Sequence, residues 1–202
     1  GAQSDMNGKA FIVLAAGSAV RFKGFYKEQL TDEDGFMLKE RVMRQFPCAF
    51  YVDNKIVPTT CCACDTFIQT EKYWKDRTTI LLSDVFYTDE AAERIKACML
   101  PVAFFSDTQD IFAISFDAHV AKILLLPAAK KVLDEGGHNH GRLWEMYRKM
   151  LCISHTTKLP PPNNPFLEIV SDPTQDFDSP DEYYRWRSGQ NKNALYQPKE
   201  KP

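Results

Sequence analysis

A turn of small residues follows the first apolar segment of the sequence and has the features of a phosphate site. Residues 14–22 read LAAGSAVRF, a run that includes Arg21, and Lys27 follows shortly afterwards. Small side chains let backbone N–H groups approach an anion closely, and nearby cations neutralise phosphate charge. The pattern therefore indicates phosphate binding. A tight strand-to-helix turn with solvated surface cations is the structural alternative.

Two acidic residues that are far apart in the sequence stand next to expected secondary-structure elements. Asp84 ends the apolar run TILLSD, and Asp178 directly precedes Ser179 and Pro180. Each has a purely structural interpretation. Asp84 could cap a helix or join a surface ion pair, and the Ser-Pro step could be an ordinary helix start.

Strand and helix signals alternate along the chain. Residues 10–16 (AFIVLAA) form a continuous apolar run, which is typical of a strand buried on both faces of a parallel sheet. Thr88 is a good N-cap for a helix over 89–99, and Ser179 with Pro180 opens another helix. The other expected strands are 79–85, 111–116 and 166–170, and the other expected helices are 36–46, 117–132 and 142–151. This alternation predicts an α/β fold, a three-layer α/β/α sandwich with a mostly parallel, Rossmann-like sheet that binds ligands beyond the carboxyl ends of its strands.

The order of these pieces resembles the nucleotidyltransferase family with the GT-A type fold, which includes sugar-phosphate, choline-phosphate and molybdenum-cofactor nucleotidyltransferases. The family's opening turn is similar to residues 14–22, and its next two elements are similar to 27–30 (KEQL) and 35–38 (GFML). Ala19 stands where the family usually has a second glycine. Because alanine tolerates positive φ poorly, this difference implies a turn that is held differently or binds phosphate less closely.

Two later segments extend the resemblance to the metal site. Residues 81–85 (LLSDV) are similar to the family's strand ending before a magnesium-binding aspartate, with Ser83 in place of a glycine, and residues 176–183 (DFDSPDEY) are similar to its closing motif. The resemblance implies that Asp84 and Asp178 bind Mg²⁺, that Arg21 lies over the β- and γ-phosphates and that Lys27 lies near the α-phosphate. The implied nucleotide-binding residues are Leu14, Ala15, Ala16, Gly17, Ser18, Ala19, Arg21 and Lys27.

The resemblance implies a magnesium-dependent enzyme that joins a nucleoside monophosphate, taken from a nucleoside triphosphate, to a phosphorylated acceptor and releases pyrophosphate. A sugar phosphate is the default acceptor. Two alternatives stay open. A GT-A type glycosyltransferase would consume a nucleotide sugar, and a non-catalytic nucleotide-binding module would be consistent with Ala19 and Ser83 in place of glycines.

Composition limits the partners of this protein. The chain has 202 residues, with 25 Lys and Arg against 27 Asp and Glu, so no global field attracts nucleic acid or an anionic membrane. Neither a membrane-spanning run nor the apolar core of a signal peptide is evident, so we expect a cytoplasmic protein. We expect one domain over residues 10–188, a disordered or tag-derived start over 1–9 and a flexible tail over 189–202.

The cysteines and histidines give weaker signals. Cys61 and Cys64 have C-x-x-C spacing, but a structural zinc site usually needs a second close pair, so we expect reduced thiols that pack in a core or line a cleft. His138 and His140 are typical of a polar loop. Asp65, Thr66 and Gln69 occupy the region in which the family recognises the nucleobase, although the similarity there is loose.

Overall fold

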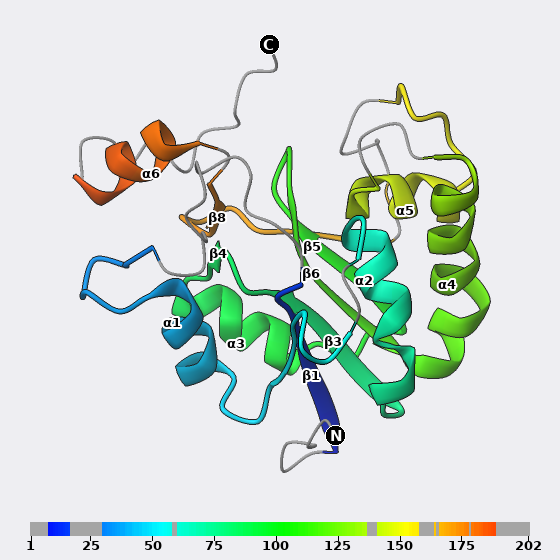
Figure 1. The fold of residues 1–202 in the computed structure, drawn as a ribbon, viewed down its shortest axis with the longest axis horizontal. Helices are drawn as coiled ribbons and strands as arrows, with labels where there is room; N and C mark the ends of the chain where they lie inside the picture. Colours follow the sequence, from blue (N-terminus) through cyan, green and yellow to red (C-terminus); the bar gives the residue numbers. More distant parts are fainter. Residues whose placement is uncertain are drawn as a thin grey trace.

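The computed structural model describes residues 8–16, 30–57, 60–136, 141–157, 164, 166–177 and 179–188. The predicted N-terminal start therefore falls outside these ranges except for Gly8 and Lys9, and the predicted tail falls wholly outside them. Within the described residues no helix is both long enough and apolar enough to cross a membrane. Figure 1 shows a central sheet with helices on either side.

Among the described residues, six strands form the central sheet, in the order β2-β1-β3-β6-β5-β7. Strands β1, β2 and β3 are parallel, β6 is antiparallel to both of its neighbours, and β7 is parallel to β5. The sheet is therefore mostly parallel, and in this part of the chain β6 is the reversed strand. The sheet strands are β1 (Lys9–Leu14), β2 (Phe50–Val52), β3 (Arg77–Leu82), β5 (Val102–Ser106), β6 (Ile111–Asp117) and β7 (Leu167–Ile169), and a separate antiparallel pair consists of β4 (Val85–Phe86) and β8 (Gln175–Asp176).

Helices cover both faces of the sheet. The α-helices are α1 (Leu38–Gln45), α2 (Ala63–Gln69), α3 (Asp89–Ala97), α4 (Ala118–Asp134), α5 (Leu143–Met150) and α6 (Pro180–Arg187), with a 3-10 turn, η3, at Glu71–Tyr73. Alternate residues of β1 face opposite layers: Phe11 and Val13 pack with α1 and α3, whereas Ile12 and Leu14 pack with α2, α4 and α5. The predicted three-layer α/β/α sandwich with a mostly parallel sheet is confirmed.

A third, smaller core joins the last helix to the two-stranded pair. It consists of Leu38, Phe86, Phe177, Tyr183 and Trp186, with Leu30 packed against it. These side chains come from the start of α1, from β4, from the residue after β8 and from α6. Apolar burial thus holds together three regions that are widely separated in the sequence, around Leu38, around Phe86 and from Phe177 to Trp186.

Local signals explain how α3 and α6 begin. The Thr88 side chain accepts a hydrogen bond from the Ala91 backbone N–H, and the Ser179 side chain accepts one from the Glu182 N–H, so both predicted N-caps are confirmed. Pro180 occupies the first turn of α6, where its missing N–H costs nothing. Each cap fixes the point at which the chain enters a helix beside the β4–β8 pair.

The phenol of Tyr183 attaches α6 to the segment that precedes α1. Its hydroxyl donates to the Thr31 carbonyl oxygen at 2.8 Å and accepts from the Thr31 N–H at 3.1 Å. We expect Tyr183→Phe to lower the free energy of unfolding by about 1–3 kcal/mol, because both backbone groups of Thr31 lose their partner. Urea unfolding measures the change.

Tyr184→Phe is the matched control for this substitution, because the neighbouring tyrosine is 66% exposed. It should leave the unfolding midpoint unchanged. Equal effects of the two substitutions would contradict the role given to Tyr183.

Candidate functional site

The ends of three parallel strands define one edge of the sheet. Strands β1, β2 and β3 finish at Leu14, Val52 and Leu82 and point the same way, so their carboxyl ends meet there. The Ala15 N–H donates to the Val52 carbonyl oxygen at 2.9 Å, and the Ser83 N–H donates to that of Leu14 at 3.2 Å. The start of the predicted nucleotide turn therefore lies beside the residue that precedes Asp84.

Much of the predicted nucleotide site lies outside the described residues. Leu14 ends β1, and Ala15 and Ala16 follow it, so these residues are placed at the carboxyl edge. The remaining predicted nucleotide-binding residues, Gly17, Ser18, Ala19, Arg21 and Lys27, lie in the range 17–29, which the structure does not describe. Their roles stay predictions.

The two predicted metal motifs run side by side. Strand β4 begins one residue after Asp84, and it pairs antiparallel with β8, with Val85 opposite Asp176. The next residue, Phe177, is fully buried in the small core with α6. Asp178 itself lies outside the described residues, between Phe177 and Ser179. The fold therefore brings together the segments that carry Asp84 and Asp178, and Figure 1 shows β4 and β8 adjacent to each other near α6.

Tyr87, which the sequence did not single out, supports the turn that carries Asp84. Its fully buried hydroxyl donates to the Phe112 carbonyl oxygen at 2.5 Å and accepts from the Leu82 N–H at 3.0 Å. Burial raises the pKa of Tyr87 well above its ordinary value, and the charges of Asp84 and Asp176 raise it further. Both carboxylates therefore act on the same buried phenol, which places them in one electrostatic environment.

A buried carboxylate shapes the turn that leads into α1. Asp32 is 1% exposed, and one of its oxygens accepts from the Asp34 and Phe36 N–H groups at 2.9 Å. Gly35 has φ of +85°, a conformation that glycine adopts without steric cost. The predicted step from Gly35 into a helix is confirmed, with α1 beginning at Leu38.

Arg41 connects this turn to the Asp84 side of the site. Its guanidinium pairs with Asp32 at 3.2 Å, lies 4.3 Å from the centroid of the Phe86 ring and donates through Nε to the Tyr87 carbonyl oxygen at 2.9 Å. One side chain therefore links the turn before α1 to the two residues, Phe86 and Tyr87, that closely follow Asp84.

The carboxylates beside the β4–β8 pair are of the chemical type that binds a magnesium ion. Asp84, in the turn before β4, and Asp176, in the neighbouring strand β8, supply hard carboxylate oxygens, as Mg²⁺ prefers. Among the described residues no three His, Cys, Asp or Glu side chains form a metal-binding group, and Asp178 is not one of these residues. Magnesium binding by Asp84 and Asp178 stays a prediction.

The cysteines differ in burial: Cys64 is buried as expected, whereas Cys61 and Cys152 are exposed. All six cysteines are free; Cys64 is buried, and its thiol donates to the Arg142 carbonyl oxygen at 3.3 Å. Two residues of the predicted nucleobase region support the start of α2. Asp65 accepts from the Cys61 N–H at 3.0 Å, and the buried Thr66 lies 2.6 Å from the hydroxyl of Thr60.

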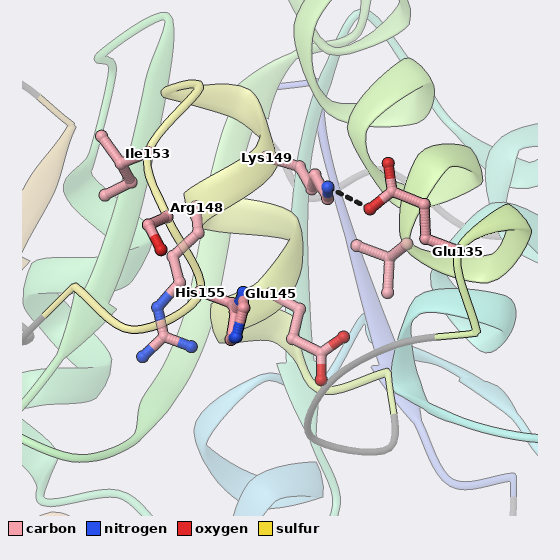
Figure 2. Close-up of a pocket in the computed structure, with 8 residues that line it drawn as sticks. Glu135, Glu145, Arg148, Lys149, Ile153 and His155 are labelled. Carbon is pink, nitrogen blue, oxygen red and sulfur yellow. Dashed lines mark ion pairs between the residues drawn. The ribbon is translucent and has the colours of Figure 1, made fainter.

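A separate pocket lies between the end of α4, α5 and the segment after it. Figure 2 shows Glu135 paired with Lys149, and Glu145, Arg148, Ile153 and His155 around the same hollow. Its lining contains none of the predicted site residues. His138 and His140 lie outside the described residues.

Comparison with known proteins supports the fold. No protein-family model matches the chain, and no curated protein matches it. Among solved structures 31 chains match, including an inositol-1-phosphate CTP transferase from T. maritima with a TM-score of 0.51 and 12% sequence identity. The match covers 91% of this chain and 96% of that one. At this identity the likeness shows that the two proteins share an α/β fold over almost their whole lengths.

Replacement of Tyr87 tests the support under Asp84. We expect Tyr87→Phe to lower the free energy of unfolding by about 1–3 kcal/mol, because the Leu82 N–H and Phe112 carbonyl lose their buried partner. Amide exchange at Leu82 should become faster in the variant. Urea unfolding and hydrogen exchange measure the two effects, and unchanged exchange at Leu82 would contradict the assigned role.

The raised pKa of Tyr87 also predicts a dependence on pH. The folded protein keeps the phenol protonated above pH 10.0, its ordinary pKa, whereas the unfolded chain releases the proton there. This contribution to stability is therefore complete below that pH and is lost as the pH rises above it. Wild-type stability should fall more steeply above pH 10.0 than that of Tyr87→Phe, with Tyr184→Phe following the wild type.

Proposed function

We propose that this protein is a nucleotidyltransferase that transfers a nucleoside monophosphate from a nucleoside triphosphate to a phosphorylated acceptor and releases pyrophosphate. The observation that carries the proposal is the antiparallel pairing of β4 with β8. It brings the Asp84 motif and the segment leading to Asp178 together beside the end of β1. The fold shared with a CTP transferase agrees with this proposal.

The reaction needs few chemical groups from the protein. An oxygen of the acceptor phosphate attacks the α-phosphorus in line, the bond from that phosphorus to the bridging oxygen breaks, and pyrophosphate leaves. A phosphate nucleophile is ionised near neutral pH, so no general base is required. Catalysis then depends on positioning and on charge neutralisation.

Specific residues take these roles in the proposal. Backbone N–H groups of residues 14–19 approach the triphosphate, Arg21 neutralises its β- and γ-phosphates, and Lys27 lies near the α-phosphate and the attacking group. Asp84 and Asp178 would hold a magnesium ion, which neutralises phosphate charge when it is bound. The contacts of Tyr87 with Leu82 and of Arg41 with the Tyr87 carbonyl oxygen keep the Asp84 turn in place beside the end of β1 and the start of α1.

The first substrates to test are those in the name of the structural neighbour, CTP and inositol 1-phosphate. Sugar phosphates in general are the default acceptor class, and they would bind at the open carboxyl edge of the sheet. The proposal includes one catalytic domain over residues 10–188 and a cytoplasmic location. A GT-A type glycosyltransferase would instead release a nucleoside diphosphate, so detection of pyrophosphate separates the two reactions.

Replacement of the two predicted metal ligands tests the proposed chemistry. We expect Asp84→Asn and Asp178→Asn to reduce magnesium-dependent pyrophosphate release by about a hundredfold or more, because the phosphate charge is no longer neutralised. A pyrophosphate assay measures the rate, and urea unfolding checks that both variants fold. Near-normal turnover in both variants would refute the metal assignment.

Asp76→Asn is the matched control. Asp76 is an exposed aspartate immediately before β3, at the amino end of the strand whose carboxyl end leads to Asp84. The substitution removes the same charge from the opposite edge of the sheet, so turnover should stay at the wild-type rate.

A second substitution tests the phosphate turn. Arg21→Ala should weaken triphosphate binding roughly 10- to 100-fold, the loss expected for one charged hydrogen-bonding partner. Calorimetry with CTP and magnesium measures the affinity. Lys122→Ala, which removes an exposed charge from α4, should bind as the wild type does. Unchanged binding in Arg21→Ala would show that the turn has a structural role alone.

A further inference from the structure

Two adjacent cysteines at the start of α2 have their sulfur atoms close together. The Sγ atoms of Cys61 and Cys62 are 3.6 Å apart, and Cys61 donates its S–H to Cys62. Cys61 is exposed and Cys62 is half-buried, and both are free thiols. The proposed nucleotidyl transfer does not use either of them.

The backbone around this pair is fixed by short contacts. Asp65 accepts from the Cys61 N–H at 3.0 Å, and the Cys62 carbonyl oxygen accepts from both the N–H and the hydroxyl of Thr66 at 3.1 Å. An ordered turn therefore holds the two thiols next to each other. They can react with each other without a rearrangement of the backbone.

Packing against Gly141 limits where the Cys62 sulfur can go. A Cβ atom at Gly141 would lie 2.3 Å from the Cys62 Sγ, so that position has no room for a side chain. The Cys64 N–H also donates to the Gly141 carbonyl oxygen at 3.0 Å. Because Cys62 is confined and Cys61 is exposed, Cys61 is the residue that can rotate toward its neighbour.

We propose that Cys61 and Cys62 form a reversible redox site, in which a small-molecule disulfide such as glutathione disulfide oxidises the pair to a bond between their own two sulfurs. A thiolate of the pair attacks one oxidant sulfur, which forms a mixed disulfide and releases the first small thiol. The other protein sulfur then attacks the protein-side sulfur of the mixed disulfide and releases the second small thiol. The two protein thiols lose two electrons and two protons, and the oxidant gains them.

The spacing of adjacent residues explains why this bond would be reversible. Neighbouring Cα atoms are about 3.8 Å apart across a trans peptide, closer than the roughly 4.4–6.8 Å of most disulfides. A bond formed at that spacing is strained, and strained exposed disulfides are the ones that reducing thiols open most easily. The hydrogen bond to Cys62 raises the pKa of Cys61 to about 11, so a high pH should speed the reaction.

The site lies at the same edge of the sheet as Asp84. Helix α2 links β2 to β3, and these two strands run in the same direction beside β1, so the first residues of α2 lie at the carboxyl edge. The redox chemistry itself does not depend on the proposed nucleotidyl transfer, and its test needs no nucleotide.

The test uses the full chain in glutathione buffers of increasing disulfide content, followed by an acid quench, alkylation and mass spectrometry. The peptide that carries Cys61, Cys62 and Cys64 should lose the mass of two hydrogen atoms and resist alkylation at two sites. Reduction with excess thiol should reverse the change. Fragmentation of the wild-type peptide should assign the new bond to Cys61 and Cys62.

Variants and an internal comparison make the outcome decisive. Cys64→Ser should still lose two hydrogens, because serine can donate to Arg142 in place of the buried thiol. Cys62→Ser should instead gain a glutathione at Cys61, as we expect for Cys152, an exposed cysteine in the same chain, and Cys61→Ser should not lose two hydrogens. Three results would overturn the proposal: a bond to Cys64, a stable mixed disulfide at Cys61 in the wild type, or a pair that stays reduced while Cys152 is oxidised.

Discussion

The packing of α6 against β4 and the segment before α1 is the interaction on which the candidate site depends. Phe177, Tyr183 and Trp186 form a small core with Leu38 and Phe86, outside the two large cores of the sandwich. With the sheet alone, the Asp84 turn would have no second acidic segment beside it. Because this third core holds β8 against β4, the edge gains a second acidic segment and becomes a corner that could bind a charged ligand.

Polar contacts then fix the corner with little freedom. The Tyr87 hydroxyl accepts the hydrogen bond of the Leu82 N–H, as a neighbouring strand would. The Arg41 side chain contacts Asp32, the Phe86 ring and the Tyr87 carbonyl oxygen. Buried polar groups that have all their partners hold one arrangement, since any alternative would leave donors or acceptors unpaired. The candidate site is therefore built on groups that do not themselves face the ligand.

The local parts of this architecture could be predicted from the sequence, because their causes are local. The caps at Thr88 and Ser179, the buried run that forms β1 and the glycine step into α1 each depend on a few neighbouring residues. The prediction of a strand over 79–85 merged β3 with β4, since apolar residues continue on both sides of the turn at Ser83 and Asp84.

Features set by distant contacts were missed. Strand β5 follows Pro101 as a five-residue run with no alternation, and its tight return into β6 makes β6 antiparallel. Strands β2 and β8 have three and two residues, too few for a period to show. Asp32, Arg41 and Tyr87 look like ordinary polar residues, and their roles come from burial against segments far away in the sequence. The pairing of β4 with β8 is of the same kind, although the similarity of both segments to one family suggested that they belong together.

The position of β8 and α6 in chain order bears on how the molecule is made. Every strand of the described central sheet precedes Gln175, so a chain emerging from the ribosome can assemble the sandwich before these last elements are available. The acidic corner would then be completed only after the strands of the sheet have been made. A nascent chain could hold a folded scaffold while it still lacked the second half of its candidate site.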